Sequence, residues 1–109
     1  MSTYAISYRL EYDTDYSDRR ESVVNAIRKE AEDGKYWEEL TSLTVLRSRN
    51  SANYIASMIY LGSSFKPEKD SLLVVNTSNG TFATKGKIEY PYTLESLFSH
   101  EAAQKSGFS

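Results

Sequence analysis

The chain contains no cysteine and one histidine among its 109 residues. Without cysteine it can have no disulfide framework, thiolate zinc site or cysteine nucleophile, and it shows no sign of an oxidising compartment. With only His100, an imidazole cluster or a histidine-paired nucleophile needs a second copy of the chain, so we expect no catalytic role for it. The five glycines are too far apart for a phosphate-binding loop of known spacing. Nucleotide hydrolysis is therefore not expected.

The sequence also lacks a long apolar run, a signal-peptide pattern and a basic excess. Its formal net charge of -2 argues against a protein built mainly to coat nucleic acid. We expect a cytoplasmic protein with no membrane partner and no small-molecule cofactor. Hydrophobic residues make up 39% of the chain, enough for one core. The sequence predicts a single domain over residues 1–109, with its core over about 3–90 and a C-terminal helix and tail over 93–109.

Residues 3–10 alternate between apolar and polar side chains, which is typical of a strand with one buried face. A polar loop follows, after which Ser17 offers an N-cap for a helix that Gly34 can end. The apolar positions of this helix recur at spacings of three and four: Val23, Val24, Ile27 and Ala31.

The middle of the chain predicts two further strands around a second helix. Residues 39–47 are rich in β-branched and apolar side chains, which favours one strand. A polar break leads into an apolar helical stripe that begins at Ala52 and that Gly62 can close. Residues 71–77 contain a continuous apolar run, typical of a central strand covered on both faces.

The last third of the chain predicts a hairpin and a short helix. Asn79-Gly80 is the strongest turn signal, because both residues tolerate positive φ, and it indicates a strand over 81–84. Residues 87–90 alternate again, and 93–103 have apolar side chains at helical spacing, with Thr93 as a cap. An edge strand in this region can also pair with the tail of a second copy.

Two helices with one apolar stripe each need a shared sheet face. We therefore predict an α+β fold, specifically a ferredoxin-like βαββαβ-type sandwich. Its antiparallel sheet carries both helices on one face, with an extra C-terminal strand and a short helix. Because the other sheet face then stays open, the sequence also predicts a homodimer formed through that face.

Three segments also carry a resemblance to a known family: residues 4–10, residues 36–46 and residues 70–75. With the helix through Val24 and Ile27, they resemble the CRISPR-associated protein 2 superfamily, in particular its short stand-alone SinR-like and virulence-associated protein D-like members. The resemblance covers roughly residues 3–77. It implies a ferredoxin-like protomer and a homodimer. Some members act as metal-dependent endonucleases on RNA or DNA, and others are scaffolds without cleavage.

In the enzymatic members, an aspartate at the end of the first strand holds a divalent metal between the two protomers. The matching position in this chain is Arg9. A guanidinium stays protonated and offers only hydrogen-bond donors, so it cannot coordinate a cation. We therefore expect a non-catalytic homodimeric binding or scaffold module, with nucleic acid as a candidate partner.

Two alternative functions stay open. Asp13 and Asp15, with Asp18 nearby, can supply oxygen ligands for magnesium or manganese, as a divalent-metal-dependent endoribonuclease requires. The same acids also fit a polar turn followed by an acidic helix start. The third candidate is a small protein-partner-binding factor in phage or plasmid conflict, which the fold permits and no residue demonstrates.

A group of aromatic and basic residues is the candidate surface for nucleic acid or a partner. Tyr12 and Tyr16 follow the first strand, close in sequence to Arg9, Arg19 and Arg20. Single-strand binding uses aromatic rings for base stacking beside cations that bind phosphate. The sequence therefore predicts that these five side chains share an exposed surface.

Overall fold

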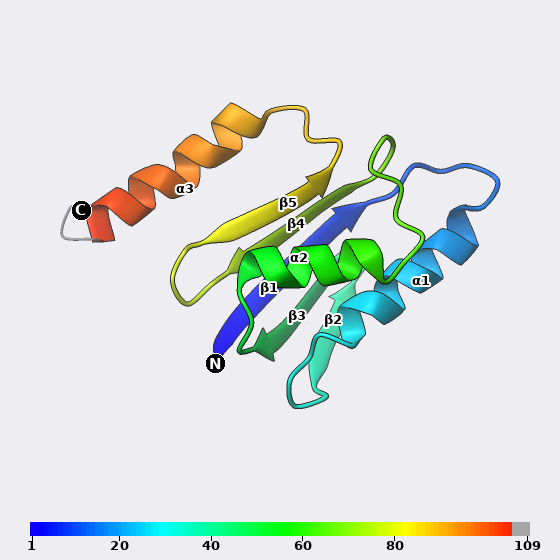
Figure 1. The fold of residues 1–109 in the computed structure, drawn as a ribbon, viewed down its shortest axis with the longest axis horizontal. Coiled ribbons are helices and arrows are strands. Elements are labelled where there is room, and N and C mark those ends of the chain that lie inside the picture. Colours follow the sequence, from blue (N-terminus) through cyan, green and yellow to red (C-terminus); the bar gives the residue numbers. More distant parts are fainter. Residues whose placement is uncertain (106–109) are drawn as a thin grey trace.

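The chain folds into a five-stranded antiparallel sheet with three helices, an α+β structure (Figure 1). The computed structural model describes residues 1–105 and the side chains of residues 1–98, so the last four residues of the predicted tail lie outside the described residues. The elements in chain order are β1 (Ser2–Arg9), α1 (Tyr16–Arg28), β2 (Tyr36–Leu40), β3 (Leu43–Ser48), α2 (Ala52–Leu61), β4 (Ser71–Asn76), β5 (Phe82–Gly86) and α3 (Pro91–Lys105). In this described part, every helix is too short or too polar to cross a membrane.

The sheet is built around the first strand of the chain. Its order is β2-β3-β1-β4-β5, and β1 pairs antiparallel with both β3 and β4. The connections through α1 and α2 both pass over the same face, so these two helices form one layer in front of the sheet (Figure 1). α3 lies apart from that layer, beyond β5 at the edge of the sheet (Figure 1).

The core lies between this helix layer and the sheet. The alternation predicted for residues 3–10 is confirmed, because every second side chain of β1 is buried on the helix side. The apolar stripes of both helices pack against these positions and against β4. The large buried side chains of this core are Tyr4, Ile6, Tyr8, Val23, Ile27, Ile55, Ile59, Leu72 and Val74.

The single strand predicted over residues 39–47 is wrong, because this segment contains the turn between two antiparallel strands. β2 pairs with β3, with Trp37 opposite Val45 and Leu40 opposite Leu43. The turn at Thr41 contains neither glycine nor proline, and most of β2 is exposed, so no hydrophobic period marks its beginning.

Burial along β4 also differs from the prediction of a strand covered on both faces. Leu72 and Val74 are buried under the helices, whereas Leu73 and Val75 on the other face are only half-buried. Because apolar residues occupy both faces of this strand, its sequence does not reveal that α1 and α2 cover only one of them.

Several predicted element boundaries shift. α1 begins at Tyr16 and ends at Arg28, so the predicted cap Ser17 lies inside the helix. Ala31 follows α1 in a tighter turn and still packs against the core. α3 begins at Pro91, a residue suited to the first helical position, so Thr93 is not the cap.

The hairpin predicted at Asn79-Gly80 is confirmed, although only the glycine of this pair has a positive φ, at 75°. The second alternating segment, residues 87–90, does not form a strand. Gly86, with φ of 87°, turns the chain at the end of β5, and the Lys87 amide then donates to the Asp70 carbonyl at 2.8 Å. The chain therefore leaves the sheet before these residues can pair.

Candidate functional site

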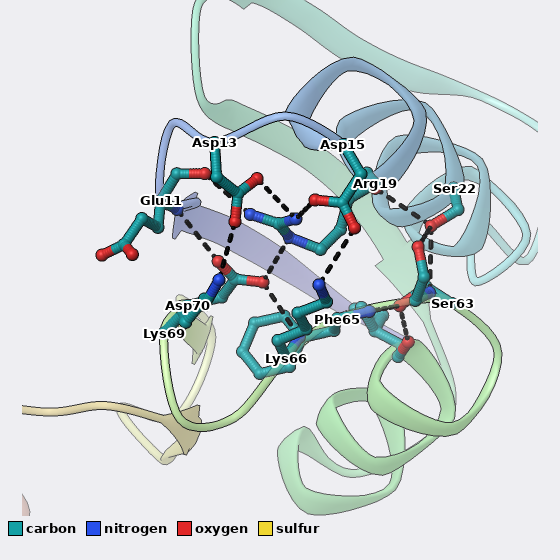
Figure 2. Close-up of polar contacts among 12 residues, drawn as sticks. Glu11, Asp13, Asp15, Arg19, Ser22, Ser63, Phe65, Lys66, Lys69 and Asp70 are labelled. Carbon is teal, nitrogen blue, oxygen red and sulfur yellow. Dashed lines mark hydrogen bonds and ion pairs between the residues drawn. The ribbon is translucent and has the colours of Figure 1, made fainter.

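Two of the predicted metal ligands meet at a buried arginine (Figure 2). Arg19 is on the first turns of α1, and its side chain is only 1% exposed. Its Nη1 donates to Asp13 Oδ1 at 3.0 Å and also to Asp15 Oδ1, while its Nη2 donates to the Glu11 carbonyl at 2.7 Å. The prediction that Arg19 lies on an exposed surface is therefore wrong.

Asp70 is the third carboxylate around this guanidinium, and it is fully buried. Arg19 Nε donates to Asp70 Oδ2 at 2.9 Å. The backbone amides of Glu11 and Lys66 donate to the two oxygens of the same carboxylate, each at 2.9 Å. Because these groups come from the end of β1, from α1 and from the loop before β4, Asp70 fastens three segments together (Figure 2).

Two lysines complete the charge balance of this site. Lys69 Nζ lies 3.0 Å from Asp13 Oδ2, and Lys66 Nζ lies 2.9 Å from Asp15 Oδ2. We call these six residues the Arg19 cluster: Asp13, Asp15, Arg19, Lys66, Lys69 and Asp70. Its three cations balance its three carboxylates, which is the condition under which charges can be buried.

The cluster shifts the pKa of two of its members. Hydrogen bonds from Lys69 and then Arg19 hold the pKa of Asp13 well below its usual range. Burial acts to lower the pKa of Arg19, but hydrogen bonds to Asp13 and Asp70 outweigh it and raise this pKa above its usual value. Both groups therefore stay charged at neutral pH.

The cluster leaves little room for a cation at the predicted ligands. The Arg19 guanidinium lies between Asp13 and Asp15, where a shared metal ion would have to sit. Asp18 is exposed on the first turn of α1 and has no ion pair with the described residues. Among the residues that the structure describes, no group of three or more His, Asp or Glu side chains is placed to hold a metal.

Because Arg19 is buried, the five residues predicted to form a nucleic-acid surface do not all lie on one exposed surface. Tyr12 is 86% exposed, and its ring lies 5.0 Å from that of Tyr16, beside the start of α1. Arg20 donates to the Thr41 carbonyl at 3.0 Å, so it lies against the turn between β2 and β3. Arg9 is exposed at the end of β1 and has no ion pair within the described part of the chain.

The sheet face opposite the helix layer carries an apolar row that crosses all five strands. Residues aligned by the strand register form this row, in the order Trp37, Val45, Ala5, Val75 and Phe82. Their side chains point away from α1 and α2, because the residues on either side of Ala5 in β1 are buried beneath those helices. Trp37 is 42% exposed, and the other four are half-buried. We call this surface the uncovered face.

The uncovered face is nearly symmetric about β1. The apolar row has aromatic rings at both ends, valines inside them and Ala5 at the centre. A second row repeats the pattern, with Ser7 on β1 between Leu43 and Leu73. The small side chains of Ala5 and Ser7 therefore lie between larger apolar residues of β3 and β4.

A hollow of about 350 Å³ lies beside Trp37. Its lining residues come from the β2 edge, from β3 and from the start of β1: Thr3, Lys35, Tyr36, Trp37, Val45, Leu46 and Arg47. At the opposite edge, the ring of Phe82 is stacked against Phe98 of α3, with 4.6 Å between centroids. One edge of the uncovered face is therefore hollowed and the other carries a stacked aromatic pair.

Asp70, Lys66 and Lys69 were missed as members of the site. All three lie in a polar loop around a proline, where the sequence suggests ordinary solvated charges. The one available signal is the position of Asp70 directly before a buried strand, and this does not tell a buried acid from an exposed one.

Comparison of the chain with protein-family models, with curated proteins and with solved structures finds no match in any of the three.

Proposed function

We propose that this protein is a non-catalytic binding or scaffold module that works as a homodimer, with the uncovered faces of two copies packed together. The first four strands run in the order β2-β3-β1-β4, with α1 and α2 as their crossovers, which supports a ferredoxin-like protomer. The single observation that carries the dimer is the apolar row across all five strands. A soluble monomer rarely leaves so continuous an apolar surface open.

The symmetry of the face favours a second copy as its partner. A two-fold axis close to β1 places Ala5 against the Ala5 of the partner subunit and each Val45 against the partner's Val75. The apolar row of one copy then packs against the same row of the partner, which runs in the opposite direction across the sheet. An isologous interface requires such a self-complementary surface. Two sheets can pack in this way at about 10 Å, with their strands roughly 30° apart.

The Arg19 cluster supports a non-catalytic role. A divalent ion at Asp13 and Asp15 would have to displace the protein cations that already hold their oxygens. The exposed Arg9 repels a cation at the end of β1. Incubation of the protein and single-stranded RNA with magnesium or manganese tests this role, and we expect no cleavage. Metal-dependent cutting that Asp13→Ala and Asp15→Ala abolish would establish the endoribonuclease instead.

Arg9 also supports an anionic partner. The same two-fold axis brings both copies of Arg9 to one end of the interface, so a dimer carries their positive charges side by side. Phosphate groups are the anions that guanidinium recognises best in nucleic acids, and single-stranded nucleic acid is the partner we propose for this end.

Sedimentation equilibrium tests the homodimer. We expect wild type to sediment as a dimer and Val75→Glu as a monomer, because the new carboxylate lies in the apolar row and would be buried without a partner. The matched control is Tyr54→Glu on α2, where the side chain is exposed on the helix layer. Far-UV circular dichroism checks that both variants fold. A wild type that stays monomeric at high concentration would refute the proposed function.

A further inference from the structure

α3 (Pro91–Lys105) meets the sheet at one edge and otherwise extends away from the body of the protein (Figure 1). Among its described side chains, Phe98 ties α3 to the sheet by stacking on Phe82, with the two rings inclined by 34°. Other large side chains on and before α3 are exposed, including Tyr92 and Leu97, which is 67% exposed. The contacts of the described α3 side chains within one copy leave this apolar surface exposed.

The stack places α3 on the uncovered face. Phe82 lies opposite Val75 in the register, so its ring points away from α1 and α2, and Phe98 packs on that side. Phe82 also forms one end of the apolar row, while Trp37 and the hollow beside it form the other end. The aromatic pair and the hollow therefore lie at the same level of the sheet, on opposite edges.

We propose that α3 is part of the dimer interface and that the aromatic pair Phe82–Phe98 of each copy enters the hollow beside Trp37 of the partner subunit. This inference rests on the proposed homodimer and specifies its contacts. A two-fold axis close to β1 exchanges the two edges of the sheet, so it brings each aromatic pair over a hollow. The occupant of the hollow is thus a second copy of this chain.

The charges around these two features are complementary. The hollow is lined by Lys35 and Arg47, and of these Arg47 is paired with Asp33. Lys35 has no ion pair within the described part of the chain. Glu95 lies three residues before Phe98, so the two side chains share one face of α3. Insertion of the aromatic pair therefore brings the Glu95 carboxylate, which has no ion pair with the described residues, close to Lys35 of the partner subunit.

Point variants of the full chain test the inference. We expect Phe98→Ala to weaken the dimer by about tenfold or more in Kd, as removal of a central aromatic anchor does. Glu95→Lys and Lys35→Glu should each weaken the dimer, and the double variant should recover affinity because the pair is restored with reversed charges. If α3 only stabilised the fold of its own copy, the double variant would not recover dimer affinity.

Cross-linking gives an independent measurement, since the chain has no cysteine of its own. A tagged Glu95→Cys protein is mixed with untagged Lys35→Cys and treated with a short bis-maleimide reagent. We expect a covalent heterodimer from this mixture, and none when Tyr54→Cys on α2 replaces Glu95→Cys.

The outcomes separate the two proposals. A dimeric wild type whose affinity is unchanged by Phe98→Ala, with no charge-swap recovery and no cross-link, would overturn the role of α3 and leave the homodimer standing. A monomeric wild type would overturn both.

Discussion

Arg19 and Asp70 form an ion pair of 2.9 Å in which neither side chain has meaningful contact with solvent, at 1% and 0% exposure. They lie 51 residues apart in the chain, one on α1 and the other just before β4. The pair therefore couples the first turns of α1 to the loop before β4. The Arg19 guanidinium also pairs with Asp13 and Asp15, so these acids are partners of a cation and not candidate metal ligands.

Removal of Arg19 should strongly destabilise the fold. Arg19→Met leaves the buried Asp70 carboxylate without its charged partner, and we expect a loss of about 3–5 kcal/mol in the free energy of unfolding. The control is Arg20→Met at the next position, where the guanidinium is only partly buried and donates to one carbonyl, with an expected loss below about 1 kcal/mol. Urea unfolding followed by circular dichroism measures both. Equal losses would contradict the role of the buried pair.

The Arg19 cluster should make stability depend on acid pH. The pKa of Asp13 in the folded protein lies well below the usual 3.8, so folding favours its charged form. This contribution is fully present above the unfolded pKa and is lost as the pH falls below about 4 toward the folded pKa. We therefore expect the melting temperature of wild type to fall more steeply below pH 4 than that of Asp13→Asn.

Glu68→Gln serves as the control for that pH series, because Glu68 is exposed and has no ion pair with the described residues. Its acid profile should follow wild type. Parallel melting profiles for wild type and Asp13→Asn below pH 4 would contradict the prediction.

Two glycines with positive φ should respond differently to alanine. At Gly86, with φ of 87°, an added Cβ would lie 2.0 Å from the Asp70 carbonyl oxygen, so the backbone itself must move. At Gly34, with φ of 73°, nothing lies within 4 Å of an added Cβ. We expect Gly34→Ala to cost about 1 kcal/mol through φ alone, and Gly86→Ala to cost clearly more. Thermal unfolding of the two variants provides the comparison, and similar losses would show that the contact can relax.

Single-stranded RNA should bind weakly and with a marked salt dependence, because the contact we propose is a phosphate held by Arg9. Arg9→Ala should lower the affinity and flatten the slope of log K against log salt. Arg49→Ala is the matched control, because Arg49 is an exposed arginine after β3. It should change the RNA affinity and the salt slope less than Arg9→Ala does. Fluorescence anisotropy at several salt concentrations measures both quantities. Absence of binding by wild type at low salt would remove nucleic acid as a partner.

Much of the fold follows from local patterns in the sequence. The alternation of β1 and the stripe of α2 both depend on contacts that repeat with the period of their element, so they can be read along the chain. Ser51 caps α2 by accepting the Tyr54 amide, which is also a local interaction. The turn at Thr41 was not predicted, because it contains neither glycine nor proline and is held in place by the pairing of β2 with β3.

The candidate site could be predicted only in part. Asp13, Asp15 and Arg19 stand close together in the sequence, and their types indicate charge chemistry. Whether these acids face a metal or a guanidinium depends on where the Arg19 side chain points and on the lysines brought by a distant loop. Charge pairing between residues far apart in the chain produces no periodic pattern in the sequence from which it could be predicted.

The sequence by itself determined most of the element types, the helix stripes and the apolar character of the strands in the core, because these follow from neighbours along the chain. Only the tertiary structure decided that Arg19 is buried against Asp70 and that Trp37, Val45, Ala5, Val75 and Phe82 form one row across the sheet. The physical reason is that burial of a charge and the register of strands depend on groups that the fold brings together from distant parts of the chain.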